Sequence, residues 1–465
     1  MAGGTRAGGE RAAEGRELLD VGDEVVSWAR DGEQVEVVVA YSKDTEVRVY
    51  EGEVESFSSA ESQGVGIRVI TGVDGGGRRQ GFAYAGTLDQ DVLRETLDDA
   101  RDNAGFGTVD ELLGLAEPDG VPVPELDLWN DEIGQVPTER KVALATELEA
   151  AVRGADARIS GVESAEFVDS VGEAAVVTTT GIRSAGREVA CYLAAYALAS
   201  EGDDTQTGFG YSVGRRLSEL DVGKAAQEAA DRATRLLGAT KPGSQRTSVV
   251  LDPFVTAQLL GIVGGTLSGE AVLKGRSLFA DRVGEPVGAR LLTLVDDPTD
   301  VRAFTAGETD GEGLACRRNV LIQDGVLQGF VHNTYTGRAL GTTSTGSAVR
   351  GFKSTPGAGC QAISLLPGVK SQEQLVAEVG DGILVQGVSG LHSGVNPVSG
   401  DFSTGAEGLR IVGGAVGEPL REFTIASTLQ RLLLDVAAVG SDLEWFPMSA
   451  NGVSLVIHDV TVSGA

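Results

Sequence analysis

The sequence predicts an α+β protein with two large regions. In the N-terminal half, apolar residues alternate with polar ones at period two, as in half-buried antiparallel strands. Other stretches of that half repeat apolar residues at helical spacing. The second half contains one almost wholly apolar helical stretch among short strands and glycine turns. We therefore expect an N-terminal α+β domain with helices packed on an antiparallel sheet, and a C-terminal domain of mainly antiparallel sheet or open barrel around one buried central helix.

The N-terminal elements follow one another in a clear order. Residues 1–10 are predicted to be a disordered tail, and a helix over 12–30 ends at Asp31-Gly32. Thr87 and Gln90 have the form of a capping box at the start of the next helix. Residues 105–136 are predicted to be a long loop. The remaining predicted strands lie at 35–40, 47–50, 54–57, 64–70, 81–84 and within 158–200, and the remaining predicted helices at 137–152 and 217–237.

The best domain boundary is the segment 239–247, which is rich in Pro, Gly and charge. It separates a predicted N-terminal domain, 11–238, from a predicted C-terminal domain, 248–465. After a strand at 248–251, Asp252 can cap a helix and Pro253 fits its first turn. This apolar helix is predicted to be buried and to end at Gly264-Gly265. Asp324-Gly325 is predicted to turn a hairpin, a helix is expected at 333–340, and longer strands at 418–425 and 453–462.

Composition excludes several classes of protein. The chain has 465 residues, 41% of them hydrophobic, so it can bury a large core. Its net charge of −30 repels phosphate backbones and anionic membranes. Three scattered cysteines do not make a disulfide framework. The N-terminal segment lacks the apolar core of a signal peptide, and no apolar run approaches the ~20 residues of a membrane span. We expect a cytoplasmic protein that binds no nucleic acid and no membrane.

Several blocks of the sequence resemble the TldD/PmbA family, also called the TldD/TldE peptidase family. They are LLGIVGGTLSGEAVLKGRSLFADRVGEPV from Leu259, GVGIRV and GFAYAG in the N-terminal strands, the block 310–348, NPVSGDFSTGAEGLRIVGGAVGEPL from Asn396, and VGSDLEW at 439–445. The resemblance covers nearly the whole chain. It implies a TldD-like fold and a paired, often heterodimeric, peptidase that acts on unfolded or modified peptides.

The resemblance also implies that the catalytic residues are missing. In the active branch, the central helix carries His-Glu-x-x-x-His, with two zinc ligands and a general base. With the shared Ser-x-Phe and Val-Gly-Glu as register, these positions fall on Leu260, Gly261 and Gly265, and a further cysteine ligand falls on Val439. None of the four can bind zinc. The chain is therefore similar to the PmbA/TldE branch: no catalytic residue, metal or cofactor is expected in it, and zinc is expected in a TldD-like partner.

Scattered residues leave other chemistry open. The histidines His332, His392 and His458 include no two at ligand spacing on one helix, although a site assembled through the fold from His332, His392, Cys316 or Cys360 stays conceivable.

A serine hydrolase site has weak support in the sequence. Ser389 lies three residues from His392, but Gly-x-Ser-x-Gly is absent, and proximity along the chain is not a catalytic dyad. Ser389, His392 and Asn396 are kept as weak candidates for the wall of a substrate channel.

Three hypotheses follow for the function. The first is a non-catalytic subunit that shapes the substrate channel of a heterodimeric zinc metallopeptidase, with an extended peptide or a small amide as substrate. The second is a stand-alone peptide-binding or scaffold protein, and the third is an autonomous hydrolase with an unrecognised site. A neighbouring gene that encodes His-Glu-x-x-x-His would favour the first.

Overall fold

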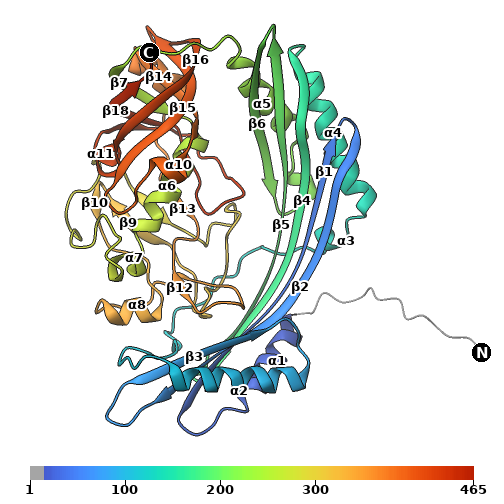
Figure 1. Cartoon of the computed structure of the whole chain (residues 1–465), viewed down its shortest axis with the longest axis vertical. Coiled ribbons are helices and arrows are strands. Elements are labelled where there is room, and N and C mark those ends of the chain that lie inside the picture. Colours follow the sequence, from blue (N-terminus) through green and yellow to red (C-terminus); the bar gives the residue numbers. More distant parts are fainter. Residues whose placement is uncertain (1–14) are drawn as a thin grey trace, which may run out of the picture.

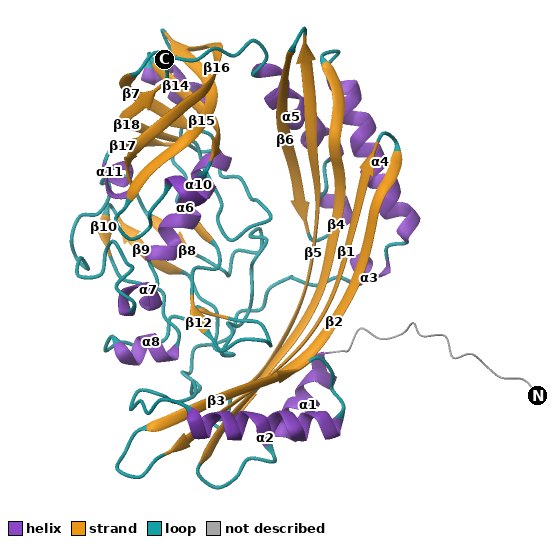
Figure 2. Ribbon diagram, viewed as in Figure 1, coloured by secondary structure: helices purple, strands orange, loops and turns teal. Residues whose placement is uncertain are grey.

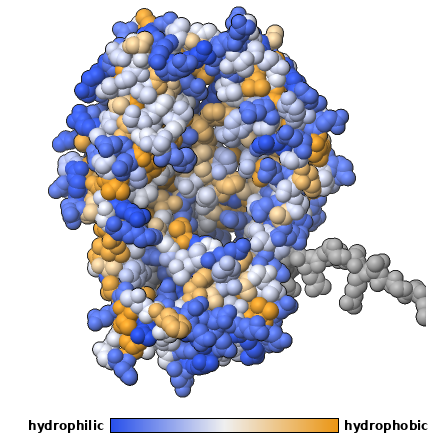
Figure 3. Space-filling view, viewed as in Figure 1, coloured by the Kyte–Doolittle hydropathy of each residue, from blue (hydrophilic) through white to orange (hydrophobic). Residues whose placement is uncertain are grey.

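The computed structural model of the chain describes residues 15–465, so the predicted tail at 1–10 lies outside the described residues. One long curved sheet from the N-terminal half stands beside a C-terminal domain built around a barrel (Figure 1 and Figure 2). The surface is hollowed between the two (Figure 3). The predicted α+β class is confirmed.

The N-terminal sheet has six antiparallel strands in the order β3-β2-β1-β4-β5-β6. It is built from the same unit used twice, namely a helix, three strands and a second helix. Because β1 pairs with β4 at the centre, the two units meet in the middle of one continuous sheet. The first unit comprises α1 (Gly15–Val26), β1 (Glu33–Tyr50), β2 (Glu53–Gly72), β3 (Arg78–Ala85) and α2 (Gln90–Phe106). The second comprises α4 (Thr138–Ala155), β4 (Ile159–Thr178), β5 (Arg183–Glu201), β6 (Asp204–Gly214) and α5 (Val222–Arg235), with α3 (Asp131–Gln135) and the 3-10 turn Leu217–Glu219 in the connections.

The second strand, β2, is covered over only part of its length. Residues 64–70 are buried, and β3 pairs with residues 65–72. Residues 53–63 are exposed throughout, and within the described part of the chain they pair with β1 alone. Val54 and Phe57 are among these exposed residues. This half of β2 therefore offers a free strand edge with apolar side chains.

The main sheet of the C-terminal domain closes on itself. Its order is β16-β15-β14-β7-β18-β17, and a further pairing of β16 with β18 closes five of these strands into a barrel. The pairs are antiparallel except β7 with β14. The sheet comprises β7 (Gln245–Leu251), β14 (Gly382–Ser389), β15 (Asp401–Val412), β16 (Ala415–Thr428), β17 (Val436–Val439) and β18 (Leu455–Ser463).

Shorter elements complete this domain. The strands are β8 (Leu294–Asp296), β9 (Asn319–Gln323), β10 (Val326–Leu327) and β13 (Ile363–Leu365) in one sheet, with β11 (Ala348–Val349) and β12 (Gly357–Ala358) as a separate pair. The helices are α6 (Pro253–Thr266), α7 (Gly269–Leu273), α8 (Thr334–Ala339), α9 (Gln372–Val379), α10 (Leu391–Gly394) and α11 (Leu429–Leu434). Within residues 15–465, no helix combines the length and apolar character needed to cross a membrane.

Local predictions failed where a competing contact decides the geometry. The capping box at Thr87 does not form: the N-cap of α2 is Asp89, whose side chain makes no cap bond, and the Thr87 hydroxyl accepts from the Asp89 N–H instead. The apolar helix continues past Gly264-Gly265 to Thr266, because both glycines keep a helical backbone. The loop predicted at 105–136 contains α3, whose N-cap Asn130 accepts from two backbone N–H groups.

Candidate functional site

The organising element of the C-terminal domain is α6. Asp252 caps it by accepting from the Phe254 N–H at 3.1 Å, and Pro253 occupies its first turn, as the sequence predicts. One face is buried and mostly apolar: Val255 and Leu259 reach into the barrel interior, and Leu260 is 0% exposed. This face closes the main hydrophobic core of the domain.

The opposite face of α6 is bare. Gly261 and Gly265 lie on it one turn apart, both exposed, and they line a cavity of about 410 Å³. Lys274 and Arg276 come from the segment that follows α7, and Pro397 and Val398 from a loop beyond α10. The cavity therefore has a floor on α6 that includes the two glycines, a charged side with Glu270, Lys274 and Arg276, and an apolar side.

The structure brings together only two of the four positions that the resemblance assigned to the zinc motif. Gly261 and Gly265 share the cavity. Leu260 points into the core, and Val439 is a buried residue of β17 that pairs with Leu455 of β18. The four positions are therefore divided between the cavity and the hydrophobic core.

The weak channel candidates lie at the end of β14 and on the loop that follows it, and of the three only Asn396 adjoins a residue that lines the cavity, Pro397. Ser389 ends β14 and His392 lies in α10; both are exposed, and no hydrogen bond joins them in the described structure. Asn396 has a structural role, since its Oδ1 accepts from the N–H groups of Val398 at 2.9 Å and Ser399 at 3.2 Å. It thereby holds the loop that borders the cavity.

The other histidines and the cysteines do not assemble into a site. His332 is buried, its Nδ1 lies 3.3 Å from Thr336 Oγ1, and burial lowers its pKa. His458 Nδ1 lies 2.8 Å from Ser248 Oγ at the surface. Burial raises the pKa of the Cys316 thiol to about 12. Burial also raises the pKa of the Cys360 thiol well above its usual value, so both thiols are poor nucleophiles. Across residues 15–465, no three His, Cys, Asp or Glu side chains gather closely enough to hold a metal ion.

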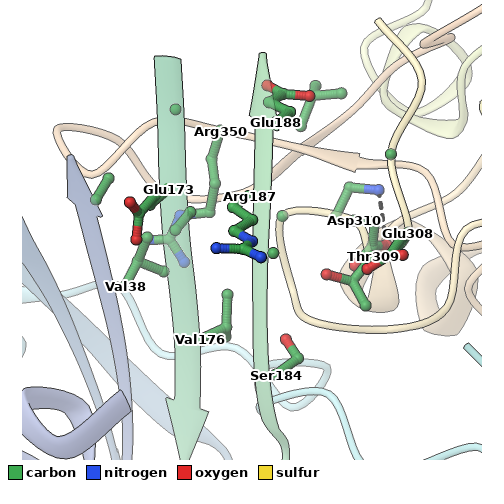
Figure 4. A pocket seen from close by; sticks show the side chains of 18 of the residues that line it. Val38, Glu173, Val176, Ser184, Arg187, Glu188, Glu308, Thr309, Asp310 and Arg350 are labelled. Carbon is green, nitrogen blue, oxygen red and sulfur yellow. Dashed lines mark hydrogen bonds between the residues drawn. The ribbon is translucent and has the colours of Figure 1, made fainter. Parts of the chain in front are cut away.

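A second cavity, of about 430 Å³, separates the concave face of the N-terminal sheet from the C-terminal domain. Figure 4 shows Glu173, Arg187 and Glu188 on the strands, and Glu308, Thr309 and Asp310 on the loop opposite. Burial, aided by the nearby Glu312 carboxylate, raises the pKa of Asp310 to about 7. Asp310 accepts from three backbone N–H groups, those of Glu312, Leu314 and Ala348, so it shapes its own loop.

A buried ion cluster at the edge of this second cavity joins the two regions. Arg68 Nη2 of β2 lies 2.6 Å from Glu36 Oε2 of β1 and 3.8 Å from Glu312 Oε1 of the C-terminal domain. Arg350, also of the C-terminal domain, pairs with the other oxygen of Glu36. All four side chains are 5% exposed or less. Two arginines and two glutamates thus hold the sheet against the C-terminal domain in a place without solvent.

Comparison with known proteins matches three consecutive family models. They are the PmbA/TldA metallopeptidase domain 1 at 35–104, the central domain at 131–237 and the C-terminal domain at 244–464. Together they cover most of the chain. The chain belongs to the PmbA/TldD family.

Relatives from both branches of the PmbA/TldD family align over nearly the full length. "Metalloprotease PmbA" of Escherichia coli O157:H7 is 27% identical over 431 residues, covering 92% of this chain and 91% of that protein. "Metalloprotease TldD homolog" of Haemophilus influenzae is 24% identical and covers 96% of each. The solved structure of TldE from Thermococcus kodakarensis has a TM-score of 0.85 at 24% identity, covering 97% of this chain and 99% of that chain. A solved structure from Thermotoga maritima has a TM-score of 0.88 at 23% identity, covering 96% and 99%.

The side chains at α6 do not fit the zinc ion that a PmbA/TldD metallopeptidase implies. Zinc is held by His, Cys, Asp or Glu. Among the described residues that line the α6 cavity, Glu270 is the one such side chain, and it is paired with Lys274. We therefore assign no zinc chemistry to this cavity.

Sequence reasoning missed the second cavity and the ion cluster. Glu36 and Arg350 are separated by 314 positions, and each belongs to an ordinary strand or loop pattern. The one available signal was a charged residue at an otherwise apolar strand position, Arg68 within GVGIRVI. Such a residue needs a buried partner, but the sequence does not show which.

Proposed function

We propose that this chain is the non-catalytic, TldE-like subunit of a two-chain amide hydrolase of the PmbA/TldD family. A TldD-like partner supplies the zinc ion, and this chain completes the channel for unfolded or modified peptides or natural-product precursors, in the cytoplasm. The observation that carries the proposal is the cavity on the exposed face of α6, which is lined by two glycines and by the paired Glu270 of α7 but by no set of metal ligands.

The uncovered half of β2 supports the need for a partner. Residues 53–63 leave a strand edge free, and natural proteins generally cover or blunt such edges. Val54 is 44% and Phe57 46% exposed on this strand. A strand from the partner would pair with the edge and bury both side chains, within an interface of roughly 2,000 Å² or more, as stable dimers have.

The proposal is tested by mixing the chain with a homologue from the same genome that carries His-Glu-x-x-x-His. We expect a one-to-one complex by light scattering, peptide hydrolysis that needs both chains, and zinc only in the homologue by metal analysis after dialysis against a weak chelator. If the homologue alone is as active as the mixture, the scaffold hypothesis takes its place.

A pair of variants locates the interface. Phe57→Asp places a charge on the free edge and is expected to weaken the complex at least about tenfold, because a buried unpaired carboxylate is costly. Val412→Asp is the matched control: Val412 is 58% exposed at the turn between β15 and β16, so its replacement should leave the complex unchanged. Equal weakening by both variants would contradict this assignment.

A further inference from the structure

The exposed face of α6 carries two glycines that the fold does not require. Neither has a positive φ, so neither serves a turn. A Cβ at Gly265 would meet no atom within 4 Å, and one at Gly261 would meet only the Cβ of Ala450 at 3.9 Å. Glycine in the interior of a helix is less stable than alanine. These two positions therefore lower the stability of α6 without relieving any contact within the described chain.

Other glycines of the C-terminal domain lie where a side chain would collide with neighbouring atoms, so the fold requires glycine there. A Cβ at Gly264, on the buried side of the same helix, would lie 3.0 Å from Ile363 Cδ1. One at Gly452 would lie 1.7 Å from the carbonyl oxygen of Pro253. Packing within the chain accounts for these glycines and does not account for Gly261 and Gly265. We therefore interpret the missing side chains at these two positions as room for another molecule that contacts the backbone of α6.

The walls of the cavity indicate the chemistry of that ligand. Pro397 and Val398 form an apolar side, and Val398 is 52% exposed. On the basic side, Lys274 pairs with Glu270, whereas Arg276 is exposed and makes no salt bridge within residues 15–465. The hydrogen bond from Lys274 and, to a smaller degree, the charge of Arg276 lower the pKa of the Glu270 carboxyl. An exposed guanidinium without a salt bridge can bind a carboxylate through two parallel hydrogen bonds. The site is thus locally cationic in a chain of net charge −30.

We propose that this cavity binds the C-terminal end of an extended peptide, with its main chain against Gly261 and Gly265 and its terminal carboxylate on Arg276. The charge of the whole chain favours this source of the carboxylate over an acidic side chain in an acid-rich segment, which the chain repels. The proposal extends the proposed function, on which it rests for the choice of a peptide as ligand. Its test uses this chain alone, so the two can fail separately.

The test measures fluorescence polarisation of an N-terminally labelled pentapeptide of alanine and valine with the full chain. We expect saturable binding of the free acid and roughly 10- to 100-fold weaker binding of the same peptide with an amidated C-terminus, as for loss of a charged hydrogen-bond pair. Arg276→Gln should weaken the free acid to the same degree. Arg290→Gln, at an exposed arginine that does not line the cavity, is the matched control and should leave affinity unchanged.

A second set of variants distinguishes the effect of filling the cavity on peptide binding from the effect of the same substitution on helix stability. Gly265→Ala should raise the melting temperature and yet weaken peptide binding at least about threefold, and Gly265→Leu should abolish binding by filling the cavity. Gly154→Ala, at an exposed α4 glycine whose Cβ would also meet nothing within 4 Å, should raise the melting temperature without changing binding.

Three results with the peptides and variants above would overturn the proposal, and a fourth comes from one further peptide. They are equal binding of acid and amide, unchanged affinity in Gly265→Leu, and no binding at millimolar peptide. An amidated peptide with one internal aspartate that binds as tightly as the free acid would also overturn it, because the ligand would then be an acidic side chain.

Discussion

The two faces of α6 differ in what surrounds them and therefore in what a substitution there can do. On the inner face, Leu259 and Leu260 fill the barrel and core, and a Cβ at Gly264 would crowd Ile363. On the outer face, Gly261 and Gly265 meet open space. One 14-residue helix thus joins a tightly packed surface, where shape is constrained, to a surface with room for another molecule. The following variants test that contrast, from the largest expected effect to the smallest.

The largest effect is expected from the triple variant Leu260→His, Gly261→Glu and Gly265→His, which introduces the zinc motif at positions on both faces of α6. Leu260 is 0% exposed, so its histidine would be buried without a partner and would cost about 4 kcal/mol or more of unfolding free energy. The three side chains would not converge, so we expect neither tight zinc binding nor peptide hydrolysis. Urea unfolding, metal analysis and a peptide assay measure these outcomes. The double variant at the two glycines alone should keep its stability.

Tight zinc binding and hydrolysis by the triple variant would show that the two faces can reorganise around a metal ion. The rigid contrast between them would then be wrong.

The next effect is expected from Leu260→Ala, which removes side-chain volume from the packed face. Such a cavity typically costs about 2–5 kcal/mol, depending on how far the surroundings collapse. Leu273→Ala in α7 is the control: Leu273 is 42% exposed, and its loss should cost less than about 1 kcal/mol. The midpoints of urea unfolding measure both. Similar losses from the two variants would mean that the inner face is not tightly packed.

The smallest effect comes from adding one side chain to each face. Gly264→Val places its Cβ 3.0 Å from Ile363 Cδ1 and 3.6 Å from Cys360, so overpacking should cost about 1–3 kcal/mol. Gly265→Val meets nothing at its Cβ and should be neutral or slightly stabilising, because valine is the better helix former. Thermal unfolding compares the pair. A reversed order would invert our assignment of the faces.

The sequence predicted α6 well because its signals are local. Asp252-Pro253 fixes its start, and the apolar residues at helical spacing fix its burial. Sequence also placed the hairpin turn at Asp324-Gly325, where both residues have positive φ. It did not show that Leu260 and Gly265 face different surroundings, because a motif register gives positions along the chain and not directions around the helix.

Analysis of the sequence predicted the long strands of the N-terminal sheet as shorter, separate strands. β1 runs unbroken for 18 residues through Ser42 and Asp44, where polar side chains interrupt the apolar alternation, because backbone pairing with β2 and β4 continues there. The sequence also did not predict that the sheet of the C-terminal domain closes into a barrel. The pairing of β16 with β18 joins residues far apart in the chain, and each strand alone reads as an ordinary sheet strand.

The buried ion cluster restricts how this protein can be assembled from parts. The family models separate residues 35–104 from 244–464, yet Glu36 and Arg68 lie in the first and Glu312 and Arg350 in the last. A chimaera that takes one of these segments from a relative with different residues at the junction would bury an uncompensated charge, at a cost of about 3–5 kcal/mol. The two segments are therefore separate in the sequence, but their contributions to stability are coupled through the ion cluster. Exchange by recombination would succeed only when both halves of the charge network are inherited together.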